Sequence, residues 1–187
     1  MMIRKAEKQD YKQAAVLIYN AIHDIANALT GEHDKEKVLE QLERYFYQEG
    51  NRLSYHNCLV KTVDHGPVGI IIAYHGRDAQ NLDAPIRTHV RKSTGKEPFL
   101  NQEADVTDFY VDTLSVNPKF GGRGFGTELL QSMTNYAKVQ GYPTVSLNVE
   151  ETNDKARRLY ERLGFSYKET IMINHHVYHY LVKTIIT

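Results

Sequence analysis

The feature that most constrains the fold of this chain is a glycine-rich turn that opens directly into an amphipathic helix. Glycine occupies four of the six positions from 121 to 126. Apolar residues then recur at helical spacing through Leu129 and Met133, and Gly141 ends the pattern. The first N–H groups of a helix have no partner within it, and they carry partial positive charge. Because glycines leave these groups uncovered, this stretch predicts a phosphate or pyrophosphate site.

The turn does not fit either of the two common nucleotide-binding patterns. The pattern GxxxxGK[ST] needs a lysine after its last glycine, whereas Thr127 and Glu128 follow Gly126. The pattern GxGxxG fails because the third glycine stands too close to the pair at 122 and 124. A tight turn without a ligand is the alternative, but such a turn does not need four glycines ahead of a strong helix. The phosphate site is therefore the favoured interpretation.

Length and composition restrict the class of protein. The 187 residues suit one domain, so residues 1–187 are expected to form a single domain. Lys and Arg number 23, as do Asp and Glu, and this balance argues against a nucleic-acid partner. One cysteine excludes both an intramolecular disulfide and a cysteine-rich zinc site, and no metal is expected. Without an apolar run of about 20 residues or an apolar signal core, we expect a cytoplasmic protein with no membrane partner.

Hydrophobic periodicity predicts the order of elements as β-α-α-β-β-β-α-β-α-β-β. This order is typical of an α+β, or mixed α/β, domain with helices packed on a central sheet. Residues 76–107 are polar and weakly periodic, so they are predicted to form a long inserted loop, in which Ile86 and Val90 suit at most a short helix. The expected strands and helices cover residues 2–5, 10–29, 34–50, 58–63, 68–74, 108–116, 125–140, 145–149, 153–163, 165–173 and 177–186.

Two motifs resemble those of the Gcn5-related N-acetyltransferase (GNAT) family. LSVNPKFGGRGFGTELL, residues 114–130, is similar to the family's cofactor loop, written [QR]-x-x-G-x-[GA]. Gly124 and Gly126 match its later fixed positions, while Gly121 stands where the family has Gln or Arg. NVEETNDKARRLYERLGF, residues 148–165, is similar to the second motif, an Asn that begins a helix ending at Gly-Phe. The resemblance implies a mostly antiparallel twisted central sheet flanked by helices, and transfer of an acetyl or other acyl group from acetyl-CoA to a primary amine.

The resemblance also implies roles for particular residues. Residues 114–116 would pair with the pantetheine arm, residues 122–127 would bind the pyrophosphate, and Asn153 would hydrogen-bond the arm. Tyr160 would give a proton to the departing thiolate, a role that suits a phenol, although the spacing also fits a core tyrosine. In full, the cofactor-binding residues implied by the resemblance are Leu114, Ser115, Val116, Gly121, Gly122, Arg123, Gly124, Phe125, Gly126, Thr127, Asn148, Asn153 and Tyr160.

A carboxylate on the strand beside the thioester is predicted to take the proton from the amine. Asp112 is the first choice because it shares a strand face with Leu114, two residues away. Asp108, further along the same face, is the second. The alternative for either residue is that it binds a cationic substrate or is a solvated charge at the sheet edge. A backbone N–H of residues 114–116 would meet the developing oxyanion.

The acceptor side has weaker signals. Candidate acceptors are small-molecule or peptide amines, and the protein is expected to act as a monomer or homodimer. A non-catalytic domain of the same fold that senses acyl-CoA is the alternative function. Five residues near strand ends are expected to line the acceptor pocket rather than to hold zinc: Glu150, Glu151, His175, His176 and His179.

Overall fold

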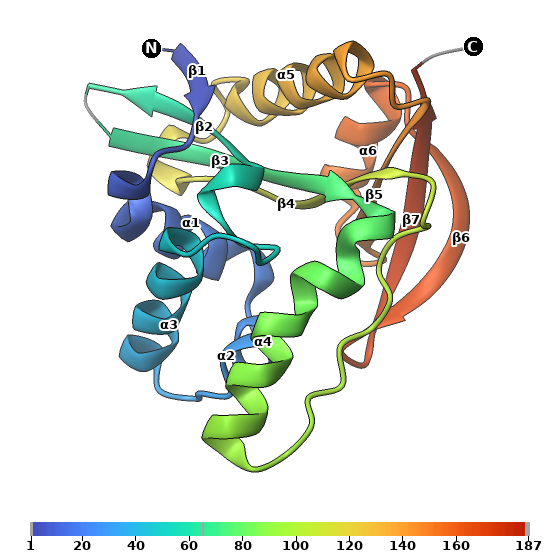
Figure 1. The fold of residues 1–187 in the computed structure, drawn as a ribbon. Coiled ribbons are helices and arrows are strands. Elements are labelled where there is room, and N and C mark those ends of the chain that lie inside the picture. The colour runs from blue at the N-terminus through green and yellow to red at the C-terminus, as the bar shows by residue number, and fades with distance from the viewer. Residues whose placement is uncertain (1, 65, 186–187) are drawn as a thin grey trace.

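The centre of the molecule is a single sheet, seen in a computed structural model that describes residues 2–64 and 66–185. In the described chain, seven strands follow the order β1-β2-β3-β4-β5-β7-β6 (Figure 1). Here β4 and β5 run parallel, whereas the other neighbouring pairs of the described strands run antiparallel. The mostly antiparallel sheet is thus confirmed. The strands are β1 (Met2–Lys5), β2 (Cys58–Val63), β3 (Gly66–His75), β4 (Phe109–Val116), β5 (Thr144–Glu150), β6 (Ser166–Ile173) and β7 (His176–Thr184).

Helices cover both faces of the sheet (Figure 1). The sequence of strand β3 is almost continuously apolar because both of its faces are buried. Ile70 and Ile72 belong to the core under α1 to α4, whereas Ile71 and Ala73 belong to the core under α5 and α6. The helices are α1 (Tyr11–Ile22), α2 (Ile25–Thr30), α3 (Lys35–Tyr47), α4 (Ala79–Thr94), α5 (Phe125–Val139) and α6 (Asp154–Arg162).

The predicted helix starts are confirmed by their capping bonds. The Asp34 carboxylate accepts from the backbone N–H groups of Glu36 and Lys37, both at 3.1 Å, and begins α3. Asn153 Oδ1 accepts from the Ala156 N–H at 3.1 Å and begins α6. These bonds satisfy helix N–H groups that would otherwise lack a partner.

The prediction of one helix over residues 10–29 is wrong. The first helix ends before His23, whose φ of 44° and ψ of −117° lie outside the helical region. A second helix, α2, begins at Ile25. The apolar spacing hides this break because Ala26 and Leu29 of α2 pack into the same core as Ile18 of α1. Residues 21–25, at the junction of the two helices, line the candidate site described below.

The prediction of a loop over residues 76–107 is also wrong, because residues 79–94 form the long helix α4. The apolar stripe of α4 is a single row of four residues, Ala79, Leu82, Ile86 and Val90, and Pro85 lies inside the helix. So narrow a stripe, interrupted by a residue that disfavours helix interiors, gives little periodic signal. The rest of the stretch, residues 96–107, runs from the end of α4 back to β4 without regular structure (Figure 1).

The last two strands lie where the sequence predicts them. Positive φ angles at Asn174 and His175, 45° and 68°, form the turn between β6 and β7. Strand β7 ends at Thr184. Residue 186, the predicted end of this strand, lies outside the described residues.

Candidate active site

The parallel strands β4 and β5 separate part of the way along the sheet. Their register begins at Phe109 with Val145 and stops at Val111 with Leu147. Beyond that point β4 still pairs with β3, and β5 still pairs with β7. The edge of β4 that faces β5 therefore carries backbone groups without a strand partner. An extended ligand can hydrogen-bond to these groups as an added strand would.

A cleft of about 220 Å³ occupies the opening between the two strands. Its walls come from the junction of α1 and α2, from β4, from β5 and α6, and from β6 and β7. Leu114 on β4 and Tyr160 on α6 both line it. Polar side chains form much of the remaining wall, and many of them hydrogen-bond to each other.

The glycine turn lies beside the same edge of β4. Gly122 and Gly124 have φ of 75° and 80°, a conformation that other residues rarely adopt. A Cβ added at either would meet nothing within 4 Å, so the backbone here borders open space. A Cβ added at Gly126 would lie 3.9 Å from Val116 Cγ2. The turn, the β4 edge and the cleft thus follow one another along the molecule.

Aromatic side chains in and beside the turn pack against the start of α5. Phe125 is buried at the start of α5, and its ring stacks with that of Phe120, the centroids 6.4 Å apart. Arg123 places its guanidinium 5.2 Å from the Phe120 ring centroid. Lys61 Nζ lies 4.9 Å from the centroid of the Phe125 ring and pairs with Glu128 at 2.5 Å. The predicted anion site therefore has a fixed backbone and one exposed cation, Arg123.

The helix that follows β5 brings two predicted residues to the cleft. Asn153 caps α6 and lines the cleft at its first turn. The Tyr160 ring packs edge-on against Phe165, with centroids 6.2 Å apart. Burial raises the pKa of the Tyr160 phenol to about 12, so its hydroxyl stays protonated at neutral pH.

The predicted base, Asp112, is held by a buried arginine that the sequence analysis missed. Arg52 pairs with Oδ1 of Asp112 through Nε at 3.0 Å and also through Nη2. The hydroxyls of Tyr74 and Thr113 each donate to the Asp112 carboxylate at 3.0 Å. The Asp112 side chain is 3% exposed. Arg52 precedes Asp112 by 60 residues, and no local pattern connects the two.

The same guanidinium binds two further carboxylates. Glu103 Oε2 accepts from Arg52 Nη2 at 2.8 Å, and Asp83 Oδ1 of α4 lies 3.4 Å from Arg52 Nη1. Glu103 lines the cleft, whereas Asp83 contacts Arg52 but is not among the residues that line the cleft. Burial raises the pKa of the Glu103 carboxyl above its ordinary value, although the Arg52 guanidinium opposes this shift.

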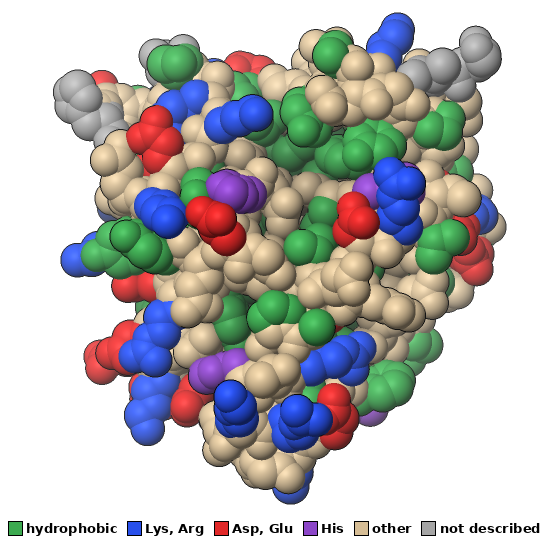
Figure 2. Space-filling view, viewed as in Figure 1, with side chains coloured by type: hydrophobic (Ala, Val, Ile, Leu, Met, Phe, Trp, Pro, Cys, Tyr) green, Lys and Arg blue, Asp and Glu red, His purple; other side chains and the backbone are tan. Residues whose placement is uncertain are grey.

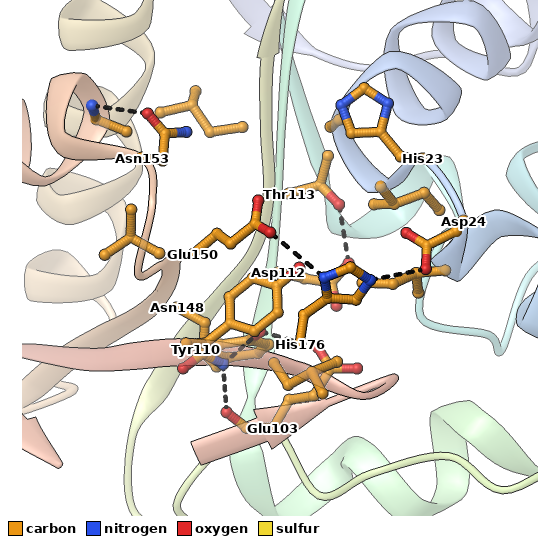
Figure 3. Close-up of a pocket in the computed structure, with 18 of the residues that line it drawn as sticks. His23, Asp24, Glu103, Tyr110, Asp112, Thr113, Asn148, Glu150, Asn153 and His176 are labelled. Atoms are coloured by element: carbon orange, nitrogen blue, oxygen red, sulfur yellow. Dashed lines mark hydrogen bonds and ion pairs between the residues drawn. The ribbon is translucent and has the colours of Figure 1, made fainter. Parts of the chain in front are cut away.

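Asn148, a predicted cofactor ligand, connects β5 to residues 96–107. Its Nδ2 donates to the Glu103 backbone carbonyl at 2.8 Å and to the Tyr110 hydroxyl at 3.0 Å (Figure 3). The Tyr110 hydroxyl in turn donates to Glu103 Oε2 at 2.9 Å. These bonds fix the orientation of the amide, and they leave Asn148 Oδ1 buried without a hydrogen-bond partner among the described residues.

The lining of the cleft is acidic and includes two histidines, His23 and His176. His176 lies between Asp24 and Glu150, at 3.2 and 3.4 Å (Figure 3). The predicted acceptor-side residues Glu150 and His176 thus line the cleft. Of the other three, Glu151 lies 4.0 Å from His179, and neither these two nor His175 belongs to the described lining.

Asp108, the second predicted base, lies away from the cleft. It is buried, and its carboxylate accepts from the Tyr180 hydroxyl at 2.6 Å. It is absent from the described lining. The alternation of β4 is interrupted between the two aspartates, because a register shift against β3 leaves Asp112 as the extra residue between Val111 and Thr113.

In the described part of the chain, no three His, Cys, Asp or Glu side chains are grouped as a metal site would require. No helix there is both long and apolar enough to cross a membrane.

Comparisons with known proteins agree on one family. The model of the acetyltransferase (GNAT) family matches residues 19–165. An uncharacterised N-acetyltransferase of Methanocaldococcus jannaschii is 40% identical over 68 residues, 36% of this chain and 28% of that protein. A mycothiol acetyltransferase of Rhodococcus jostii is 31% identical over 99 residues, 53% of this chain and 30% of that protein. The matched stretches thus span less than a third of these two relatives.

Solved structures resemble the whole chain. A crystal structure described as an acetyltransferase has a TM-score of 0.83 and 30% identity, covering 99% of this chain and 100% of that chain. An N-acetyltransferase from Staphylococcus aureus Mu50 also has a TM-score of 0.83, with 25% identity and coverage of 97% and 100%. The ribosomal-protein-S18-alanine N-acetyltransferase of Escherichia coli shares the fold, with a TM-score of 0.63, 16% identity and coverage of 100% and 94%.

Proposed function

The chain belongs to the GNAT family of acetyltransferases, and on this premise we propose that it transfers an acetyl group from acetyl-CoA to a primary amine by direct attack in the cleft between β4 and β5. One observation carries the proposal. The glycine turn lies next to the end of β4, and the unpaired edge of β4 leads from there to the cleft that Tyr160 lines.

The backbone suits the parts of a CoA thioester. The uncovered N–H groups of residues 122–127 suit the pyrophosphate, since they open the helix α5 and have no side chains above the glycines. Arg123 adds a cation beside them. The β4 edge at residues 114–116 suits the amide groups of the pantetheine arm, and Asn153 faces it from α6. Bound acetyl-CoA supplies the activated acyl group.

This chain's residues then supply the hydrogen bonds and protons of the transfer. A backbone N–H of residues 114–116 is available to the carbonyl oxygen as negative charge develops there. Tyr160, held protonated by its buried site, donates a proton to the sulfur as the C–S bond breaks. A carboxylate bound to Arg52 takes a proton from the amine. Asp112, the choice made from the sequence, stays a prediction in that role.

The charge of the cleft supports an ammonium ion as the incoming acceptor. Its lining contains one guanidinium, that of Arg52, against four carboxylates. Such an excess attracts cations and disfavours anionic amines. The four carboxylates are those of Asp24, Glu103, Asp112 and Glu150.

The test is release of CoA thiol from acetyl-CoA over a panel of amines. The panel holds spermidine, a tetrapeptide with a free N-terminal alanine, a peptide with one lysine, and free glutamate as an anionic amine. We expect amine-dependent release with at least one cationic member and little with glutamate. Binding of acetyl-CoA without release for any amine would contradict catalysis and favour the sensor function instead.

A further inference from the structure

Three carboxylates share the buried Arg52, and they differ in their access to the cleft. Asp83 lies outside the described lining. Asp112 also lines the cleft, but its side chain is only 3% exposed, and both of its carboxylate oxygens already accept hydrogen bonds, Oδ1 from Arg52 and Tyr74 and Oδ2 from Thr113. The Glu103 side chain is 12% exposed and lines the cleft. From these contacts we propose that Glu103, rather than Asp112, accepts the proton of the attacking amine.

The Glu103 carboxylate is held firmly but not fully occupied. The donors described above, Arg52 and Tyr110, both bind its Oε2. Its backbone carbonyl is fixed to Asn148 of β5. The side chain is therefore positioned from β4, from β5 and from the segment that carries Arg52, as a proton acceptor in an active site must be. Oε1 is the oxygen left for the substrate or for a bridging water.

A second acceptor beside Glu103 points to an N–H donor as the missing partner. Asn148 Oδ1 is buried and unsatisfied among the described residues, although such groups normally have partners. Flipping the amide would not help, because Nδ2 must face the Glu103 carbonyl. An ammonium group carries three donors and no acceptor. Glu103, Asn148 and Tyr160 all line the cleft, so an ammonium group bound there would be the kind of donor that this wall lacks.

The electrostatic surroundings suit a base. The burial that raises the pKa of the Glu103 carboxyl brings its basicity closer to that of the amine than an exposed glutamate would offer. Activity should then be lost as pH falls through this raised pKa, because the protonated carboxyl cannot accept a proton. The charged and titratable groups around Glu103 are Arg52, Tyr74, Asp83, Tyr110, Asp112 and Tyr178.

The reaction balances with these residues. The ammonium gives one proton to Glu103, and the freed nitrogen lone pair forms the N–C bond to the thioester carbonyl. The C–S bond breaks, and the sulfur takes the Tyr160 proton. The second proton lost by the nitrogen restores Tyr160, and Glu103 returns its proton to water. The products are the N-acetyl amine, CoA thiol and one proton.

The kinetic test compares Glu103→Gln with Asp83→Asn, which also loses a carboxylate bound to Arg52 but does not line the cleft. The inference rests on the proposed acetyl transfer, so the acceptor is the panel amine that the wild type acetylates fastest. For Glu103→Gln we expect kcat/KM to fall about 100-fold or more and the acid limb of the pH profile to disappear. Acetyl-CoA affinity should change by less than about twofold, since Glu103 is remote from the glycine turn. Asp83→Asn should keep both the activity and the acid limb.

Loss of less than about tenfold for Glu103→Gln, or an equal loss for Asp83→Asn, would overturn the assignment. A second measurement needs no acceptor. Titration of ¹³C-labelled glutamate carboxyls by NMR should show Glu103 titrating above the ordinary value of about 4.3. A midpoint at or below that value would also overturn the assignment. Wild-type inactivity with every amine would instead count against the proposed function, and the NMR result would still decide the state of Glu103.

Discussion

Replacing Gly124 with alanine separates backbone strain from phosphate binding. Gly124 has φ of 80° and precedes α5, and an added Cβ meets nothing within 4 Å. The substitution therefore costs stability only through the left-handed conformation, about 1–2 kcal/mol. For a chain of this size that lowers Tm by roughly 2–8 °C. The Cβ also enters the open space above the helix N-terminus, where the pyrophosphate is proposed to bind.

We expect the affinity for acetyl-CoA to fall roughly 10- to 100-fold, which corresponds to losing one or two hydrogen bonds to a charged group. Isothermal titration calorimetry measures this directly. Gly141→Ala is the matched control, because Gly141 has φ of 82° and equally open surroundings. It follows the far end of α5, whose 15 residues span about 22 Å.

Gly141→Ala should lose similar stability and keep the affinity for acetyl-CoA. Acetyl-pantetheine, which lacks the pyrophosphate, should be used equally well by wild type and Gly124→Ala. Unchanged acetyl-CoA affinity in Gly124→Ala, or an equal loss in both variants, would refute the assignment of the turn to phosphate binding.

Three further substitutions test other parts of the structure. Tyr160→Phe keeps the ring in place and should lower kcat about 100-fold or more, with a Tm close to that of wild type. Gly76→Ala should lower the free energy of unfolding by about 3 kcal/mol, seen in urea titrations, because its Cβ would lie 1.9 Å from the Asp105 carbonyl oxygen. Arg52→Met leaves three buried carboxylates without their cation and should cost about 3–5 kcal/mol at pH 7. The Arg52→Met deficit should shrink at lower pH, because protonated carboxyls need no cation.

Each of these substitutions has a control on the same chain. Tyr136→Phe changes a tyrosine outside the cleft and should leave kcat unchanged. Gly66→Ala adds a Cβ that meets nothing within 4 Å and should be neutral. Arg77→Met removes an exposed arginine and should change stability little. A control that behaves like its partner, or a Gly76→Ala protein as stable as wild type, would contradict the corresponding reasoning.

The parts of the fold predicted from the sequence are those written in local patterns. The start of α5 at the glycine turn and the Asn153 cap of α6 depend on residues within a few positions of each other. The mostly antiparallel sheet also follows, through the family resemblance. Helix α4 was missed because its apolar face is a single row of residues and a proline lies inside the helix.

The parts of the site that the sequence did not reveal depend on long-range contacts. Arg52 meets Glu103 and Asp112 across 51 and 60 residues. No spacing rule links an arginine after α3 to a glutamate in an irregular segment. Only the fold shows that Arg52 binds both carboxylates, and that Glu103 is the more exposed of the two in the cleft. The polar composition of residues 76–107 therefore gave no sign that Glu103 lies in the candidate site.

The most direct test of the central claim is a crystal structure of the protein with CoA. We expect the pyrophosphate on the N–H groups of residues 122–127, the pantetheine arm along the β4 edge at 114–116, and the thiol beside Tyr160. A second hollow, bordered by hydrophobic side chains and histidines, lies on the face shown in Figure 2 and is lined by His75, Tyr136 and Tyr142. CoA bound in that hollow, with the glycine turn free of phosphate, would contradict the account.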